Sequence, residues 1–122
     1  MTDPRPRLVE ERRRTALHLE ALRGDHRGFV EASKDTNADD EHDPEGATID
    51  FERSQVAALV RQAEHHLEAV DAALARLDAG TYGVCVACGR PVPAERLEVR
   101  PAAATCVGCA ERGAYFGGSV RA

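Results

Sequence analysis

The stretch from Thr48 to Ala79, TIDFERSQVAALVRQAEHHLEAVDAALARLDA, carries the most regular hydrophobic pattern of this chain. Its apolar residues alternate in steps of four and three over about four heptads, and only Arg53 breaks the rule. The seam consists of Ile49, Val56, Val60, Ala63, Leu67, Val70, Leu74 and Leu77. The pattern predicts one long helix, which Thr48 caps at its start and Gly80 ends in a left-handed conformation.

A second helix is predicted upstream, from about Pro6 to Ser33, where good helix formers predominate. Its apolar stripe is thinner and consists of Thr15, Leu19, Leu22, His26, Phe29 and Ser33. Neither stripe buries itself, so the two helices are expected to fold back on each other as an antiparallel hairpin, a rod of roughly 45 Å. A coiled coil between two copies of the chain is the alternative.

Acidic residues are concentrated where the hairpin would turn. The chain has 21 acids and 16 bases, and residues 35–45 hold six of those acids and no base. Without that segment, 15 acids would face 16 bases, so the net charge of −5 arises almost entirely there. The hairpin therefore has a predicted acidic tip at about 37–46, with Pro44 and Gly46 suited to the turn. A solvated acidic loop is the simpler interpretation.

Composition excludes several classes of protein. Aromatic residues make up 4% of the 122 residues, too few for a conventional globular core, so an extended helical architecture or a metal site is expected instead. No apolar run approaches the roughly 18 residues of a membrane span, and none follows the Arg-rich start, so neither membrane span nor signal peptide is predicted. We expect a cytoplasmic protein.

Four cysteines carry the strongest chemical signal. Cys85 and Cys88 enclose two residues, as do Cys106 and Cys109, with 17 residues between the pairs. This spacing predicts one structural Zn²⁺ per chain; a rubredoxin-type iron site uses the same ligands, and two disulfides or a redox pair are further alternatives. Gly89 and Gly108 would help the backbone fold around the sulfurs. Short strands are expected between the pairs, at Val92, Leu97 and Val99.

Catalytic chemistry is not indicated. Four thiolates close the coordination sphere of zinc and leave no position for substrate or water. His65 and His66 are adjacent on the second helix, so they point different ways and are expected on the surface. The sequence has no Gly-rich phosphate loop and no G-x-S-x-G element. We therefore predict a non-enzyme.

The run from Tyr82 to Pro101, YGVCVACGRPVPAERLEVRP, followed by Cys106-Val-Gly-Cys109, resembles the zinc-finger block of the DksA/TraR family of bacterial transcription regulators. Tyr-Gly before the first pair, Cys-Gly after it, Arg-Leu midway and Arg-Pro before the second pair carry this resemblance. The helical hairpin with its acidic tip is similar to the coiled coil of the same family.

The resemblance implies a protein that binds RNA polymerase by inserting the tip into the secondary channel, without contacting DNA. Tip residues Asp40, Asp43, Glu45 and Ala47 would then act near the catalytic Mg²⁺. Counting back from Cys85, the D-x-x-D-x-A tip of better-studied members falls on His42, Glu45 and Ala47. Arg100 matches an arginine with which such members bind the alarmone ppGpp; two assisting lysines fall on Ala69 and Ala110.

The expected fold is mainly α-helical: a long antiparallel hairpin over 1–80 and a zinc-ribbon-like four-cysteine module over 81–122, which ends in a short Gly-rich tail. The predicted function is non-catalytic transcription regulation through RNA polymerase. Two other functions stay open. One is a thiolate-zinc redox or stress sensor; the other is a zinc-ribbon scaffold that binds DNA through the arginines of residues 5–14.

Overall fold

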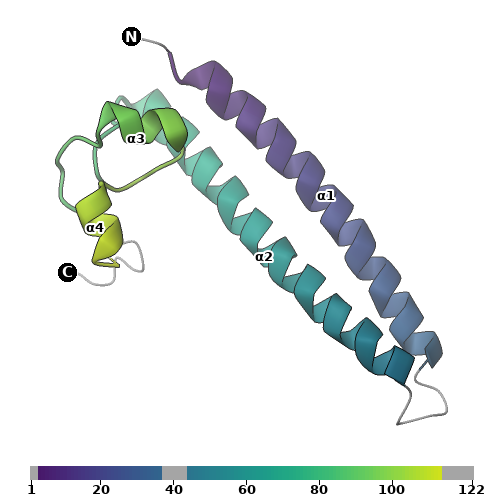
Figure 1. Cartoon of the computed structure of the whole chain (residues 1–122). Coiled ribbons are helices and arrows are strands. Elements are labelled where there is room, and N and C mark those ends of the chain that lie inside the picture. Colours follow the sequence, from purple (N-terminus) through teal and green to yellow (C-terminus); the bar gives the residue numbers. More distant parts are fainter. Residues whose placement is uncertain (1–2, 37–43, 114–122) are drawn as a thin grey trace. The chain divides into compact units, whose positions relative to one another are not determined.

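The computed structural model describes residues 3–36 and 44–113, without the side chains of 33–36 and 44–46. Within these ranges the chain forms four helices, which are α1 (Arg5–Thr36), α2 (Pro44–Ala79), α3 (Ala94–Val99) and α4 (Val107–Glu111) (Figure 1). The chain divides into two compact units. Unit 1 comprises residues 1–12 and 68–122, and unit 2 comprises residues 13–67.

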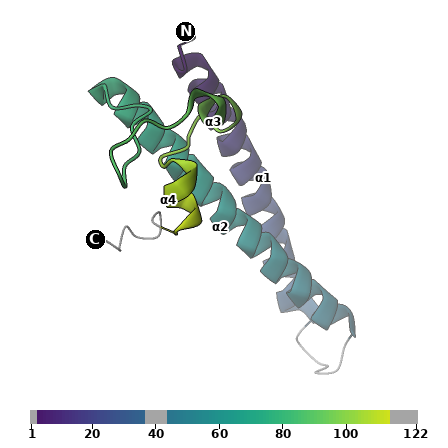
Figure 2. The same cartoon turned by 60° about the vertical axis from the view of Figure 1, so that its left-hand side comes forward.

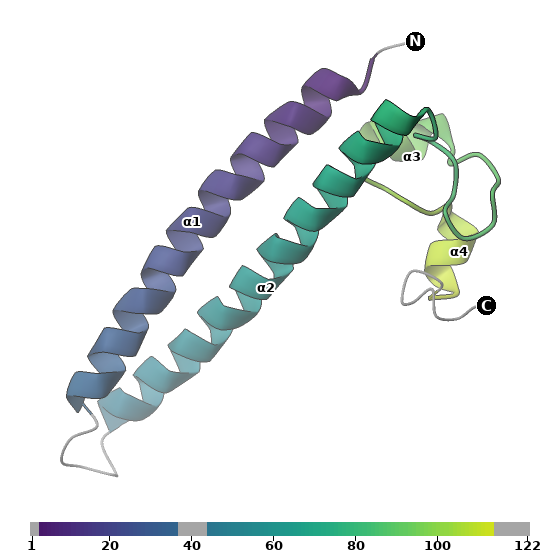
Figure 3. The same ribbon diagram turned by 180° about the vertical axis from the view of Figure 1, so that it is seen from behind.

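Unit 2 is a pair of antiparallel helical segments, one from α1 and one from α2 (Figure 3). Leu19, Leu22 and Ala63 are buried between them, and Val60 and Leu67 pack against this cluster. The guanidinium of Arg23 pairs with Glu64 across the two helices at 2.9 Å. Of the predicted seam, Val60, Ala63 and Leu67 therefore face the partner helix in this unit, and the pairing is intramolecular.

Unit 1 joins the first turns of α1 to the last turns of α2 and to the cysteine-rich region. Leu8, Val70 and Ala73 form its buried cluster. Leu74, Leu77, Tyr82 and Ala102 pack against this cluster. Salt bridges also join the two helices here. The guanidinium of Arg5 lies 2.7 Å from the carboxylate of Asp78, and that of Arg12 lies 2.6 Å from the carboxylate of Asp71. Because residue numbers rise on α1 as they fall on α2, the two segments are antiparallel here as well.

Two members of this cluster, Leu8 and Ala73, are missing from the seams that the sequence pattern identifies. Leu8 lies seven residues before Thr15, so it belongs to the same stripe, but Arg12 interrupts the spacing between them. Arg12 occupies the stripe position between Leu8 and Thr15, where its side chain pairs with Asp71 of α2. Ala73 is too small to mark a seam in a sequence rich in alanine, although it is fully buried.

Truncation of Leu8 tests this packing. Leu8 is 0% exposed, so Leu8→Ala should lower the free energy of unfolding by about 2–4 kcal/mol, through lost burial and the cavity left behind. Leu17→Ala is the matched control, because Leu17 is 58% exposed on the same helix and should change stability by less than about 0.5 kcal/mol. Urea unfolding followed by circular dichroism gives both values, and equal losses would contradict the burial of Leu8.

The ends of α2 confirm one expectation and correct another. Gly80 ends the helix with φ of 81°, and the N–H of Thr81 donates to the carbonyl of Arg76 at 2.8 Å, as in a Schellman motif. The start was predicted wrongly, because α2 begins at Pro44 and Thr48 lies inside it. Proline suits a first helical position, since it has no N–H to leave unpaired there and its φ is already helical.

The cysteine-rich region is mostly loops with two short helices (Figure 2). The short strands expected between the cysteine pairs are wrong: in this region the described residues show one isolated antiparallel bridge, Val84 with Pro91. Helix α3 occupies the rest, because Ala94 to Glu98 are helix formers that follow Pro93. Val99, expected to pack inward, is 79% exposed.

Among the helices described, none combines the length and the apolar character needed to cross a bilayer.

Candidate metal centre

Two chain reversals bring the four cysteines together. In the first, the N–H of Gly89 donates to the carbonyl of Cys85 at 2.9 Å, closing the turn that holds Cys85 and Cys88. In the second, Cys106 stands at the N-terminal boundary of α4 and Cys109 lies within that helix. The N–H of Val86 donates to the carbonyl of Ala104 at 2.9 Å and ties the two turns to each other.

The four sulfurs fit one tetrahedral ion. All four Sγ atoms lie within 4.8 Å of one another, and those of Cys88 and Cys106 are 3.9 Å apart. Four thiolates bound to Zn²⁺ at about 2.3 Å stand about 3.8 Å apart, so the set needs little adjustment. The cysteines are free thiols rather than disulfides. This arrangement is that of a structural Zn²⁺ site with four sulfur ligands and no open position.

Electrostatics at the site show why it needs a cation. Burial acts to raise the pKa of the Cys85 thiol, but hydrogen bonds outweigh burial and lower that pKa to about 6. Those bonds come from the N–H groups of Cys106, Cys88 and Ala87 and from the Cys88 thiol. Burial and the neighbouring thiols raise the pKa of Cys109 to about 12. Without a cation the Cys109 thiol therefore keeps its proton at neutral pH, whereas a bound divalent ion would favour its thiolate.

Gly89 is required by the first turn. Its φ is 78°, in the left-handed region that other residues adopt at a cost of about 1 kcal/mol or more. Gly108 differs from what the sequence suggested. It lies within α4 without a positive φ, and a Cβ there would meet Arg112 Nη1 at an ordinary 3.6 Å. The second turn therefore does not depend on glycine, because a helix supplies its N–H groups.

Arg112 is a neighbour of the site that sequence reasoning missed. Its Nη2 lies 3.2 Å from the sulfur of Cys109, three residues earlier in the chain. Four thiolates and one Zn²⁺ carry a net charge of −2, so a guanidinium at this distance partly compensates the excess. The i, i+3 spacing from a ligand at the end of a short helix is the signal that could have identified it.

Tyr82 and Arg96 hold the module together around the sulfurs. The Tyr82 hydroxyl donates to the carbonyl of Pro101 at 2.8 Å, and Arg96 Nε donates to the carbonyl of Thr105 at the same distance. These are the tyrosine of the Tyr-Gly pair and the arginine of the Arg-Leu pair in the sequence motif. Both side chains span the loop before Cys106, so they place the second cysteine pair.

The Tyr82 hydrogen bond gives a test with a pH signature. Tyr82→Phe should cost about 1 kcal/mol at pH 7, the typical value of one such bond. Burial raises the pKa of Tyr82 above 10, although Arg7 and Arg76 act against it. The folded state therefore holds this proton longer than the unfolded state, and the wild type loses stability as the pH rises above about 10. Urea unfolding gives the difference in free energy of unfolding between the wild type and Tyr82→Phe, which should be smaller above pH 10 than at pH 7. An equal difference at both pH values would contradict the hydrogen bond from the Tyr82 hydroxyl.

Most tip residues lie outside what the structure describes. Asp40 and Asp43 fall in the gap between α1 and α2, and Glu45 lies in the first turn of α2, where side chains are not described. Ala47 is exposed, still near the start of that helix. Arg100 is exposed at the C-terminal boundary of α3, where its N–H donates to the carbonyl of Arg96 at 2.7 Å. The assignments of these residues stay predictions.

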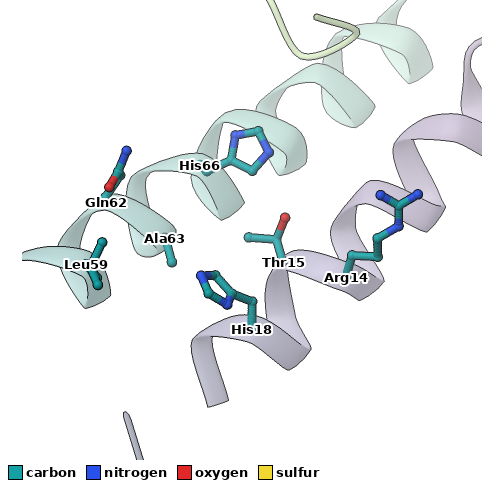
Figure 4. A pocket seen from close by; sticks show the side chains of 7 residues that line it. All are labelled: Arg14, Thr15, His18, Leu59, Gln62, Ala63 and His66. Carbon is teal, nitrogen blue, oxygen red and sulfur yellow. The ribbon is translucent and has the colours of Figure 1, made fainter. Parts of the chain in front are cut away.

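His65 and His66 are both exposed, as expected for surface residues. His66 and His18, from opposite helices of unit 2, line a hollow of about 370 Å³ that also contains the buried Thr15 (Figure 4). Two imidazoles are too few for a metal site of their own. Among the described residues, the four cysteines are the one cluster of three or more metal-binding side chains.

Residues 80–112 match the model of the prokaryotic DksA/TraR C4-type zinc finger. The chain is 38% identical over 69 residues to the uncharacterized protein YteA of Bacillus subtilis, which covers 57% of this chain and 29% of that protein. It is 28% identical over 102 residues to the RNA polymerase-binding transcription factor DksA of Haemophilus influenzae, covering 84% of this chain and 61% of that protein. The chain thus spans less than two thirds of either relative.

The fold agrees with these sequence matches. The solved structure of transcription factor DksA2 from Pseudomonas aeruginosa superposes with a TM-score of 0.70 at 29% identity, over 90% of this chain and 79% of that one. The similarity therefore extends beyond the zinc finger to the helical hairpin.

Proposed function

We propose that this chain, which belongs to the DksA/TraR family of C4-type zinc-finger proteins, is a non-catalytic regulator that binds RNA polymerase directly. The observation that carries the proposal is the similarity of the fold to DksA2 over 90% of the chain. The similar DksA of Haemophilus influenzae is an RNA polymerase-binding transcription factor. In this account the protein works in the bacterial cytoplasm and does not bind DNA.

The hairpin enters the secondary channel of the polymerase. Its helices have 32 and 36 residues, which correspond to about 48 and 54 Å of helix. The segment that joins them carries the acidic residues Asp40 and Asp43, with Glu45 and Ala47 at the start of α2. Carboxylates carried on such a projection can approach the cations and basic walls of an active site that folded domains cannot reach.

The zinc module has a structural part in this mechanism. The four sulfurs leave no ligand position for a substrate. The module holds Tyr82 and Ala102 against the buried cluster of unit 1. Arg100 is exposed and is the one residue for which we propose contact with ppGpp. A contribution of this alarmone would therefore be weak, because the lysines that assist it elsewhere in the family are Ala69 and Ala110 here.

Binding to purified core polymerase tests the function. The zinc-loaded, fluorescently labelled chain should bind at micromolar concentration or tighter, and a protein known to occupy the secondary channel should displace it. Binding without displacement would place the site elsewhere on the enzyme, and no binding would refute the function itself.

A redox sensor is a second candidate, favoured by the exposure of Cys88 in a site whose other sulfurs are more buried. Peroxide could oxidise two thiolates to a disulfide while being reduced to water, and the loss of two ligands would release zinc. Zinc release at sub-millimolar peroxide would support the sensor. Retention of zinc, with the thiols still reduced, would remove it.

A further inference from the structure

A hollow between α1 and α2 of unit 2 concentrates positive charge that neither the zinc centre nor the acidic tip explains. Its volume is about 290 Å³. It is lined by Arg23, His26 and Arg27 from α1 and by Ala57, Val60 and Arg61 from α2. All three arginines are exposed, and no aspartate or glutamate belongs to the lining. An otherwise acidic chain thus presents a local cationic surface, called here the arginine hollow.

The pattern of ion pairs along the helices explains how this surface arises. Ion pairs that join α1 to α2 include Arg5–Asp78, Arg12–Asp71 and Arg23–Glu64. Their acids follow one another at intervals of seven residues on α2. The next position in that series is Ala57, which lines the hollow. The series of acids therefore stops at the hollow while the arginines continue.

Arg27 and Arg61 are left without an acidic partner among the described residues. Arg23 does pair with Glu64, yet both of these side chains remain more than two fifths exposed. Arg23 and Arg27 are four residues apart on one helix, where like charges repel each other. A bound anion would neutralise the charge of Arg27 and Arg61, which the Arg23–Glu64 pair leaves uncompensated.

We infer that the arginine hollow docks an acidic side chain of a partner protein, with an apolar neighbour of that acid resting on Ala57 and Val60. The inference rests on the proposed function, under which the partner segment belongs to RNA polymerase. Guanidinium groups bind carboxylates through paired, charge-assisted hydrogen bonds. Two unpaired guanidiniums beside an apolar surface therefore suit a single Glu or Asp next to an aliphatic residue.

Nucleic acid suits the surface less well. A phosphate backbone requires a continuous basic track. Here Asp25, Glu31 and Glu64 lie within four residues of the arginines along the helices. A run of phosphates would meet these carboxylates on leaving the hollow, whereas one protein carboxylate would not.

Charge reversal tests the inference on the full, zinc-loaded chain. Arg61→Glu should weaken binding to core polymerase at least about tenfold, as when a like charge replaces an opposite one at an interface. Arg90→Glu is the matched control, because Arg90 is exposed in the zinc module, outside the hollow, and the change in net charge is the same. Unchanged circular dichroism confirms that both variants fold. A neutral double variant, Arg27→Ala with Arg61→Ala, should weaken binding without introducing repulsion.

The outcomes separate this inference from the proposed function. If the wild type binds polymerase and Arg61→Glu binds equally well, or if Arg90→Glu loses as much, the arginine hollow is not the docking surface although the function stands. If the wild type does not bind, the function fails, and NMR titration with poly-L-glutamate and with tripolyphosphate decides the rest. Chemical-shift changes at Arg27 and Arg61 on addition of poly-L-glutamate would support an acidic protein ligand. Changes with tripolyphosphate alone, or no changes with either, would overturn the inference.

Discussion

Removal of zinc should unfold residues 81–113 while the helices of unit 2 remain. Two of the three buried residues in the core of the module are Cys85 and Cys109, with Val92 the third, so the region has almost no apolar core without its metal. Zinc supplies about 10–16 kcal/mol of apparent binding free energy in small zinc-finger peptides, far more than a few apolar contacts can. Leu19, Leu22 and Ala63 bury one another without any residue of the module.

Chelation followed by hydrogen exchange measures this effect. Amides of residues 81–113 should lose protection when one equivalent of zinc per chain is released, whereas those of α1 and α2 around Leu19 and Ala63 should keep theirs. Cys88→Ser should reproduce part of the loss, and Val86→Ser is its matched control, because Val86 is 61% exposed in the same turn and binds no metal. Protected amides in the metal-free module would contradict the structural role of zinc.

The second large effect concerns the acidic tip. Asp43→Ala combined with Glu45→Ala should abolish the effect of the protein on transcription while polymerase binding persists, because in the proposed function these carboxylates act at the active site and the rest of the hairpin provides the contact. If both residues lie at the hairpin tip as predicted, stability should stay within about 0.5 kcal/mol. In vitro transcription, polymerase binding and urea unfolding of the same preparation give the three quantities.

A matched control removes two acids elsewhere. Asp25 and Glu31 are exposed on α1 in unit 2, so Asp25→Ala with Glu31→Ala changes the net charge equally without touching the tip. This variant should regulate as the wild type does. Equal loss in both variants would mean that overall charge, rather than the tip, is responsible; no loss in either would refute the role of Asp43 and Glu45.

Much of the fold could be predicted from periodicity and spacing alone. The seam residues Val60, Ala63, Leu67 and Val70 face the other helix because steps of three and four place them on one side of α2. The four-cysteine site followed from the two C-x-x-C pairs, since a two-residue spacer lets both thiolates approach one ion. Both features depend on local rules that tertiary context does not overturn.

Other features depend on contacts between segments that lie far apart in the sequence. Leu8 is buried because Val70 and Ala73 cover it, which a one-helix pattern cannot indicate when Arg12 interrupts the stripe. The strands expected near Leu97 gave way to α3, because local helix propensity prevailed where two cysteine turns leave little backbone to pair. The arginine hollow likewise becomes visible only once both helices are aligned.

Photo-crosslinking from the start of α2 tests whether the hairpin enters the secondary channel. Benzoylphenylalanine in place of Ala47, an exposed residue near the start of α2, should crosslink to polymerase segments that line the secondary channel, and a channel-occupying competitor should suppress the product. The same group in place of Arg90, exposed in the zinc module, should crosslink outside the channel or not at all. Crosslinks from Ala47 to the outer surface of the enzyme, or products that the competitor leaves unchanged, would contradict entry of the hairpin into the channel.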